Sequence, residues 1–353
     1  MFSGGGTLGH ILPIIPVVRK MKEENPKLKC YFVGTISGLE KKIIEESGFF
    51  LQTFYFDSQG FKRKISVYNV ITIIKYIKNY YKSKKILKRL EPEIVVGMGG
   101  YVTGAVIKAA IALKIKTLIH EQNSIYGMTN FMLRKKVDKV LLSYNIDKRS
   151  NAVVVGNPRI SEIYDKYKDQ IYYKRYFSIL AVGGSRGAAK INEIIISLRE
   201  RFLEKGINVI LITGNNYYKK NLEKISLIRN KSFIIKAFVN NLPEYLLKAD
   251  VVITRSGATT IAEVLALRRI CIFIPSPNVT NNHQEKNALE LVKRQAALMI
   301  SEKDLHKEDL FEKIVLLLED KELRNKMITT INFIADNDAC KNFVHEVNGM
   351  INK

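Results

Sequence analysis

The chain has 353 residues and a formal net charge of +23 at pH 7, with 57 Lys and Arg residues against 34 Asp and Glu residues. This length predicts about two domains of roughly 150 residues each, and the basic charge favours nucleic acid, anionic lipid or phosphorylated substrates as partners. Cys30, Cys271 and Cys340 show neither disulfide nor metal-ligand spacing, which fits a reducing cytoplasm. The glycine-rich start excludes a signal peptide, and no uncharged apolar run approaches the ~20 residues of a membrane span.

Short β-branched runs alternate with longer helical patterns along the chain, which predicts parallel sheets with crossover helices. The pattern begins again near Ser178, after a stretch rich in Tyr and Lys. We therefore expect two doubly wound α/β domains, at residues 1–160 and 161–335, and a C-terminal helix at 336–353 that packs back on the first domain. The first strand is only Met1–Ser3, so we expect a few residues to be missing from the start. The other strands are expected near Cys30–Gly34, Leu51–Phe56, Ile94–Gly97, Thr117–His120, Val140–Ser143, Ala152–Val155, Ser178–Val182, Val209–Thr213, Phe233–Lys236, Val251–Thr254, Ile270–Ile274 and Ala297–Ile300.

Four glycine-containing loops each follow a predicted strand and open a predicted helix: Gly4–His10, Gly97–Gly104, Gly183–Ala188 and Arg255–Thr260. Glycine lets backbone approach a phosphate, and a helix N-terminus offers free N–H groups and about half a positive charge. One such loop could be a mere turn, but two in each half predict a cleft that binds phosphorylated ligands from both sides. The first loop matches G-x-G-x-x-G, yet the second strand ends at Thr35 without an acidic residue, which argues against NAD.

Polar side chains near these loops are candidates for the chemistry. His10 could take a proton from an attacking hydroxyl, or only hydrogen-bond backbone at a helix start. In the run His120–Asn123, Glu121 could orient His10 or bind a hydroxyl, or the whole loop could cap the next helix.

The second half offers three further candidates. Glu263 could hold two sugar hydroxyls or simply complement a helix dipole. Gln284 and Asn287 share one helical face, which suits hydroxyl recognition or plain solvation. The run Asp336–Asp338 matches a D-x-D metal pattern, but Asp338 is better interpreted as a helix cap, so we expect no metal.

Between Ser58 and Leu90 there is no acidic residue. Basic residues at helical spacing mark one face of this stretch, and Val70, Ile73, Ile74, Ile77 and Tyr81 mark another. This pattern is typical of a helix that rests on an anionic membrane. The alternatives are a crossover helix whose apolar face packs on the sheet, and a nucleic-acid site, for which no motif is present. The residues assigned to the membrane surface are Ile73, Ile74, Lys75, Ile77, Lys78, Lys82 and Lys85.

Taken in chain order, these motifs resemble the MurG-type N-acetylglucosaminyltransferases, which complete the lipid-linked disaccharide-peptide precursor of peptidoglycan. The resemblance rests on Gly5–His10, Gly97–Gly104, His120–Asn123, Val155–Pro158, Gly183–Ala188, Asn192, Arg255–Ala258, Glu263, His283, Gln284, Asn287 and Ala288. It implies a GT-B fold, with two Rossmann-like domains facing across a cleft. It also implies inverting transfer of N-acetylglucosamine from UDP-N-acetylglucosamine to the 4-hydroxyl of undecaprenyl-diphosphate-linked muramyl-pentapeptide, without cofactor or active-site metal. The implied location is the cytoplasmic face of the plasma membrane, with cell-wall synthesis proteins as further partners and no nucleic acid.

The same resemblance implies roles for individual residues. His10 and Glu121 would be catalytic. The acceptor would contact Gly6, Thr7, Gly9, Gly100, Tyr101 and Asn123. The donor would contact Arg159, Ser185, Asn192, Val239, Gly257, Ala258, Glu263, Gln284 and Asn287, with uracil near Arg159 and Val239.

Two departures from the family pattern bear on these roles. Leu8 stands where the family usually has glycine, and Arg159 follows Pro158 one position earlier than usual. Other readings of the sequence are a GT-B transferase for a lipid such as diacylglycerol, a non-catalytic nucleotide-binding membrane scaffold, and an NAD-dependent enzyme.

Overall fold

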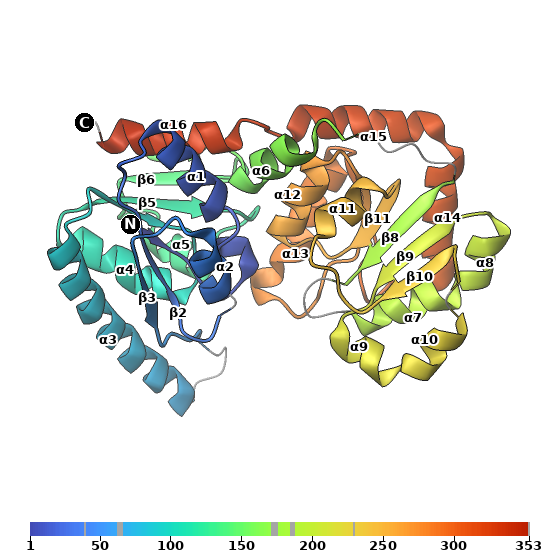
Figure 1. Cartoon of the computed structure of the whole chain (residues 1–353), viewed down its shortest axis with the longest axis horizontal. Coiled ribbons are helices and arrows are strands. Elements are labelled where there is room, and N and C mark those ends of the chain that lie inside the picture. Colours follow the sequence, from blue (N-terminus) through green and yellow to red (C-terminus); the bar gives the residue numbers. More distant parts are fainter. Residues whose placement is uncertain (39, 62–65, 171–175, 184–187, 229, 352–353) are drawn as a thin grey trace. The chain divides into compact units, whose positions relative to one another are not determined.

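The computed structural model describes residues 1–38, 40–61, 66–170, 176–183, 188–228 and 230–351. The chain divides into two compact units, Met1–Glu162 with Asp336–Lys353, and Ile163–Ala335. Each unit is a parallel sheet covered by helices (Figure 1). Among the described residues, no helix is long and apolar enough to cross a bilayer.

The first unit contains a seven-stranded parallel sheet in the order β3-β2-β1-β4-β5-β6-β7. Its strands are β1 (Phe2–Ser3), β2 (Tyr31–Thr35), β3 (Gln52–Phe56), β4 (Ile94–Gly97), β5 (Lys116–Glu121), β6 (Lys139–Leu142) and β7 (Ala152–Val154). Its helices are η1 (Leu8–His10), α1 (Ile14–Glu24), α2 (Glu40–Ser47), α3 (Val67–Leu90), α4 (Tyr101–Ala112), α5 (Met128–Leu133) and α16 (Ala339–Ile351), together with the first half of α6 (Pro158–Tyr167).

Helices cover both faces of this sheet, which explains why its central strands are buried along their length. Successive side chains of a strand point to opposite faces. Phe32 accordingly packs in the core that includes residues of α1 and α16, whereas Val33 packs in the core that includes residues of α3 and α4. Figure 1 shows these two pairs of helices on opposite sides of the strands.

Unlike an ordinary crossover helix, α3 buries mainly polar side chains and exposes several large apolar ones. The side chains that it buries most completely are Thr72, Asn79, Ser83 and Leu87. Its large apolar side chains at Ile73, Ile74 and Ile77 are 48%, 60% and 49% exposed. The alternative in which this apolar face packs against the sheet is therefore wrong.

The second unit contains a six-stranded parallel sheet in the order β10-β9-β8-β11-β12-β13. Its strands are β8 (Ser178–Val182), β9 (Asn208–Ile212), β10 (Phe233–Lys236), β11 (Val251–Thr254), β12 (Ile270–Phe273) and β13 (Ala297–Met299). Its helices are α7 (Ala189–Ser197), α8 (Arg199–Glu204), α9 (Asn215–Lys220), α10 (Leu222–Ile228), α11 (Leu242–Leu247), α12 (Ala258–Ala266), η2 (Thr280–Asn282), α13 (His283–Lys293), α14 (Lys307–Glu319) and α15 (Lys321–Ile334).

Both sheets follow the doubly wound order 3-2-1-4-5-6 when strands are counted from the start of each unit, and the first sheet adds β7 beside β6. The order reverses between β1 and β4 in the first sheet and between β8 and β11 in the second. Such switch points are where open α/β sheets bind ligands. The predicted fold class is confirmed, and each predicted strand is found to within one residue at either end.

Candidate functional site

Two glycine loops meet at the switch point of the first sheet, where β1 pairs with β4. Gly6, Gly99 and Gly100 have φ values of +83°, +106° and +87°, which L side chains rarely adopt. A Cβ atom on Gly100 would overlap the carbonyl oxygen of Gly5. The two loops are therefore in direct backbone contact, and glycine is required for that contact.

His10 is half-buried at the end of the first loop. Its Nδ1 lies 2.8 Å from the carbonyl oxygen of Gly5 and 3.3 Å from the hydroxyl oxygen of Thr7. Because a carbonyl oxygen can only accept, Nδ1 carries a proton, so in the neutral imidazole the lone pair is on Nε2. A Cβ atom on Gly99 would lie 2.7 Å from Cδ2 and 2.8 Å from Nε2 of this ring. Gly99 thus forms one wall of the slot that holds the imidazole.

Leu8 causes no backbone strain in the first loop. It is not among the residues with positive φ, and it begins the short helix η1. The neighbouring Gly6 and Thr7 are exposed, whereas Leu8 is half-buried. The backbone of this loop therefore does not require the glycine that the family usually has at this position.

Sequence reasoning missed Glu40, a carboxylate that is only 1% exposed at the start of α2. Its Oε1 accepts hydrogen bonds from the backbone N–H of Thr35 at 3.0 Å, from the Thr35 hydroxyl and from the N–H of Gly6 at 3.4 Å. A dinucleotide site would have an acid at the end of β2, whereas Glu40 comes five residues after that end. Its contact with the glycine loop is the hydrogen bond from Gly6.

Glu121 ends β5 and is 2% exposed. Its Oε1 accepts from the backbone and side-chain nitrogens of Asn123 at 3.1 and 3.0 Å, and its Oε2 accepts from Gly127 N and Asn130 Nδ2, both at 2.9 Å. These four bonds fix the loop between β5 and α5. The geometry favours Glu121 as the group that positions Asn123, rather than as a group that takes a proton.

His120 is fully buried, and burial lowers its pKa to about 4, although the hydrogen bond to the Gly156 carbonyl acts in the opposite direction. Its Nε2 donates to that carbonyl oxygen at 3.0 Å, and its Nδ1 accepts from the Gln122 amide at 3.1 Å. The same amide donates to the carbonyl of Met98 at 2.9 Å. This neutral imidazole therefore joins the ends of β4 and β5 to the segment after β7.

In the second unit, the Arg255–Gly257 loop follows β11 and is tied to α13. The Ser256 hydroxyl donates to the carbonyl of Gln284 at 2.7 Å, and Asn287 Nδ2 donates to the carbonyl of Ser256 at 3.2 Å. The side chain of Gln284 accepts from the N–H of Ser276 at 2.9 Å. The structure thus brings Gln284 and Asn287 together with the predicted phosphate loop, which continues into Gly257 and Ala258. Asn287 is fully buried, and its hydrogen bond to Ser256 fixes that loop.

The other predicted donor residues occupy separate positions. Glu263 is buried on α12. Asn192 is buried on α7, where Nδ2 donates to the carbonyl of Thr213 at 3.0 Å and Oδ1 has no hydrogen-bond partner among the described residues. Val239 is half-buried after β10. Ser185 falls outside the described residues.

Arg159 lies at the start of α6, in the first unit. Its Nη1 donates to Glu162 Oε2 at 2.6 Å, and Glu162 Oε1 is 3.6 Å from Nη2 of Arg19. Its guanidinium is thus ion-paired within its own unit. A role in contacting the donor's base stays a prediction.

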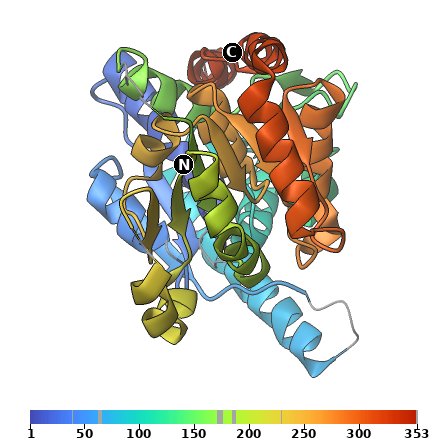
Figure 2. The same ribbon diagram turned by 90° about the vertical axis from the view of Figure 1, so that its right-hand side faces the viewer.

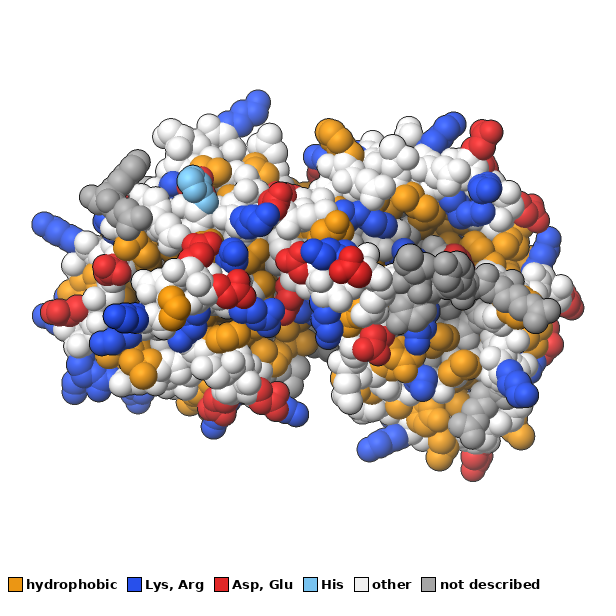
Figure 3. Space-filling model, turned by 45° about the horizontal axis from the view of Figure 1, so that its top comes forward, with side chains coloured by type: hydrophobic (Ala, Val, Ile, Leu, Met, Phe, Trp, Pro, Cys, Tyr) orange, Lys and Arg blue, Asp and Glu red, His pale blue; other side chains and the backbone are white. Residues whose placement is uncertain are grey.

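Lys75 differs from the other lysines that were assigned to the membrane surface. Its Nζ is 2.8 Å from Oδ2 of Asp57 and 3.0 Å from Oε1 of Gln59. Lys78, Lys82 and Lys85 are exposed on the same helix, which is the long light-blue helix at the bottom of Figure 2. Figure 3 shows another face of the molecule, on which Lys and Arg side chains lie among Asp and Glu side chains without a large area of a single charge sign.

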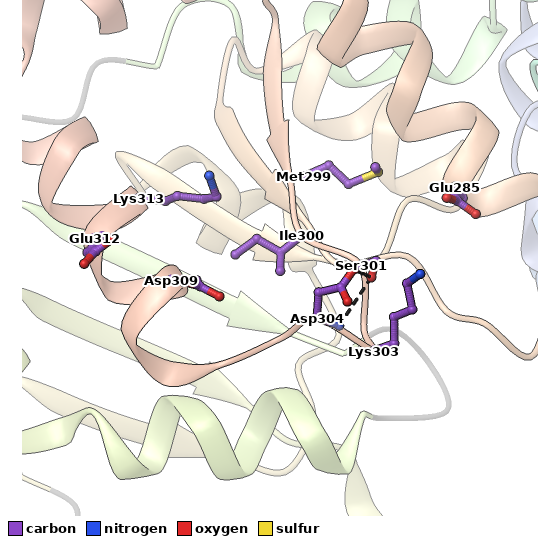
Figure 4. Close-up of a pocket in the computed structure, with 9 residues that line it drawn as sticks. All are labelled: Glu285, Met299, Ile300, Ser301, Lys303, Asp304, Asp309, Glu312 and Lys313. Carbon is purple, nitrogen blue, oxygen red and sulfur yellow. Dashed lines mark hydrogen bonds between the residues drawn. The ribbon is translucent and has the colours of Figure 1, made fainter.

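A surface pocket lies beyond the carboxyl end of β13 in the second unit (Figure 4). Its lining residues are Glu285, Met299, Ile300, Ser301, Lys303, Asp304, Asp309, Glu312 and Lys313. Carboxylates outnumber lysines in this lining, and none of the predicted donor residues belongs to it. It is therefore a poor site for a nucleoside diphosphate.

Asp336 and Asp338 form hydrogen bonds and an ion pair at the start of α16. Asp336 accepts from the N–H of Asp338 at 2.9 Å and from Asn342 Nδ2 at 3.1 Å, and Asp338 pairs with Lys341 at 2.7 Å. In the part of the chain that the structure describes, no group of three His, Cys, Asp or Glu side chains is arranged to hold a metal ion.

Comparison with known proteins identifies the class. The N-terminal domain model of glycosyltransferase family 28 matches residues 1–142, and the C-terminal domain model of the same family matches residues 178–341. The chain is thus a glycosyltransferase of family 28.

Individual relatives narrow the class further. The chain is 40% identical to a UDP-N-acetylglucosamine–N-acetylmuramyl-(pentapeptide) pyrophosphoryl-undecaprenol N-acetylglucosamine transferase of Bacillus thuringiensis, over 100% of this chain and 99% of that protein. It is 41% identical to the transferase of the same name from Bacillus cytotoxicus, over 92% of both. The crystal structure of Acinetobacter baumannii MurG superposes with a TM-score of 0.79 at 25% identity and covers 99% of each chain. The calicheamicin glycosyltransferase CalG4 shares the fold, with a TM-score of 0.72 at 11% identity over 100% of this chain and 98% of that one. The chain belongs to the MurG family.

Proposed function

We propose that the chain transfers N-acetylglucosamine from UDP-N-acetylglucosamine to the 4-hydroxyl of undecaprenyl-diphosphate-linked N-acetylmuramyl-pentapeptide, with inversion of the anomeric carbon. The observation that carries the proposal is full-length identity of 40% to transferases whose names state these substrates. The glycine loops at the two switch points support it, because both substrates are diphosphates.

The first unit would bind the acceptor. The surface around Gly6, Thr7, Gly9 and Gly100 would contact its diphosphate-sugar, with Tyr101 and Asn123 beside it. Tyr101 is 40% exposed at the start of α4, and Asn123 is held by Glu121. Nε2 of His10 would take the proton from the attacking hydroxyl, because Nδ1 already carries one.

The second unit would bind the donor. Glu263 would accept hydrogen bonds from the ribose hydroxyls, and Gln284 with Asn287 would contact the sugar. Asn192, Val239 and Ser185 would complete the site. In the reaction the acceptor oxygen bonds to the anomeric carbon as its proton passes to His10, and the bond from that carbon to the β-phosphate oxygen breaks. UDP leaves with the electron pair, stabilised by N–H groups at the start of α12, whose cap is Gly257.

The exposed face of α3 would dock on an anionic bilayer at the cytoplasmic surface of the plasma membrane. This face carries exposed isoleucines beside exposed lysines, and a bilayer would remove the isoleucines from water. Each basic residue near such a surface contributes about 1 kcal/mol, so a few of them give reversible binding.

The test supplies labelled UDP-N-acetylglucosamine with two acceptors in the same detergent, a lipid-linked muramyl-pentapeptide and diacylglycerol, in excess chelator. Label should enter the muramyl lipid alone, and His10→Ala should abolish transfer. Label in diacylglycerol would show that diacylglycerol is the acceptor and would contradict the assignment of the muramyl lipid. Donor binding without transfer to either lipid would indicate a non-catalytic scaffold.

A further inference from the structure

The peptide group between Gly5 and Gly6 is hydrogen-bonded at both of its ends. Its N–H, on Gly6, lies 3.4 Å from Oε1 of the buried Glu40. Its C=O, on Gly5, lies 2.8 Å from Nδ1 of His10. A carboxylate, an amide and an imidazole therefore form one continuous chain of hydrogen bonds.

We propose that Glu40 is a positioning residue that acts on His10 through this peptide. The proposal rests on the role of His10 given above. A carboxylate that accepts from the amide N–H polarises the amide and makes its carbonyl oxygen a stronger acceptor. That oxygen then holds the proton on Nδ1, fixes the tautomer and raises the basicity of Nε2. A carboxylate bound directly to a histidine does the same in other enzymes; here one peptide unit stands between them.

Packing is tight around Gly5, the residue that carries the carbonyl end of this peptide. A Cβ atom on Gly5 would lie 2.8 Å from Cγ2 of Thr35 and 2.9 Å from Oε1 of Glu40. On the other side, Gly100 approaches the Gly5 carbonyl so closely that it has no room for a Cβ atom. Glu40 itself is fixed by the N–H of Thr35 at 3.0 Å and by the Thr35 hydroxyl. These contacts preorganise the imidazole before any substrate binds.

Two lysines of α2 and a tyrosine of α4 near this loop are exposed, whereas the N-terminal ammonium of Met1 and Tyr31 on β2 are buried. Lys41 and Lys42 follow Glu40 on α2 and are exposed, and Tyr101 is exposed at the start of α4. Glu40 is a buried charge in contact with the loop, so its removal should change the electrostatic field at His10 more than removal of an exposed charge on the same helix.

The test compares Glu40→Gln with the wild type and with Glu46→Gln, which removes an exposed carboxylate of α2. Nitrogen-15 NMR of the imidazoles, with His10 assigned through His10→Gln, gives the pKa and tautomer of His10 without any substrate. In Glu40→Gln the pKa of His10 should fall and the fraction with the proton on Nδ1 should decrease. The acid limb of the kcat/KM profile should move to lower pH, kcat should fall about 10-fold, and KM for UDP-N-acetylglucosamine should be unchanged. Glu46→Gln should behave as the wild type.

An unchanged pKa and tautomer of His10 in folded Glu40→Gln would overturn the proposal, even if the melting temperature drops. If that variant does not fold, Glu40→Asp keeps the charge and withdraws it by one methylene from Gly6. A partial fall in the pKa of His10 is then expected, and no change would overturn the proposal. A wild-type protein without transferase activity would reject the proposed function, yet the NMR comparison would still decide whether Glu40 and His10 are coupled.

Discussion

The ammonium of Lys75 lies 2.8 Å from Oδ2 of Asp57, although 17 residues separate them in the sequence, and this contact divides the basic residues of α3 into two kinds. Lys75 is paired with the loop after β3 and also donates to Gln59. Lys78, Lys82 and Lys85 are exposed beside exposed isoleucines, and Nζ of Lys82 also lies 6.0 Å from the centroid of the Phe56 ring.

This division predicts different effects of two lysine replacements on membrane binding. The triple replacement Lys78→Gln, Lys82→Gln, Lys85→Gln should weaken binding to vesicles that contain anionic lipid by up to about 3 kcal/mol, and should leave the melting temperature unchanged. Lys75→Gln should change vesicle binding much less, because its charge is already neutralised by Asp57. Co-sedimentation at several salt concentrations measures both. Equal binding by the triple variant and the wild type would contradict the membrane role of α3.

The slot around His10 predicts that Gly99→Ala impairs catalysis more than folding. The added methyl would push against the edge of the imidazole, and a displacement of about 1 Å can cost 100-fold in rate. Gly48→Ala is a matched control, since Gly48 also has positive φ, +66°, but has open space around its Cα. Gly48→Ala should lose about 1–2 kcal/mol of stability from backbone strain. Gly99→Ala should lose more, because its φ of +106° lies outside the left-handed region, and only Gly99→Ala should lose kcat. Similar kcat values for the two variants would argue against a catalytic His10.

The buried Glu263 predicts a loss of donor affinity. Glu263→Ala should weaken binding of UDP-N-acetylglucosamine by about 1–3 kcal/mol, because hydrogen bonds to a charged carboxylate are lost. Glu319→Ala, at an exposed carboxylate of α14, should leave affinity unchanged. Isothermal titration calorimetry with UDP and with UDP-N-acetylglucosamine measures this. An unaltered affinity in the Glu263 variant would reject its assignment to the ribose.

The neutral His120 predicts a pH dependence of stability. Its pKa is about 4 in the folded chain against an ordinary value of 6.5. Above pH 6.5 it is neutral in both states. As the pH falls from 6.5 to 4, the unfolded chain binds a proton that the folded chain does not bind, so the free energy of unfolding falls by about 3 kcal/mol. Urea unfolding at pH 7 and pH 4 should show a smaller difference for His120→Gln than for the wild type. An equal difference would mean that His120 is not held neutral.

The fold could be predicted because parallel strands buried on both faces form continuous β-branched runs, such as Val251–Thr254. The loops at the switch point of the first sheet could be predicted because three of their glycines with positive φ, Gly6, Gly99 and Gly100, lie where strands end.

The partners of individual side chains could not be predicted, because they depend on how distant segments come together. A glutamate at a helix start, such as Glu40, is ordinarily explained by the helix dipole, and nothing local indicates its contact with Gly6. The pairing of Lys75 with Asp57 is equally hidden, since it depends on the rotation of α3 about its axis. That rotation also buries Thr72, Asn79 and Ser83 in place of the isoleucines.

The central claim is that the chain joins two specific sugars, and the structure of the product tests it most directly. The protein should be incubated with UDP-N-acetylglucosamine and the lipid-linked muramyl-pentapeptide, and the lipid product analysed by mass spectrometry and proton NMR. The account predicts one added N-acetylhexosamine in a β-linkage to the 4-oxygen of the muramyl residue, with one UDP released per linkage. Solved structures of UDP-N-acetylglucosamine 2-epimerases share this fold at 13–15% identity. A lipid that stays unmodified while the donor is converted to its 2-epimer, or a product with retained α-configuration, would contradict the account.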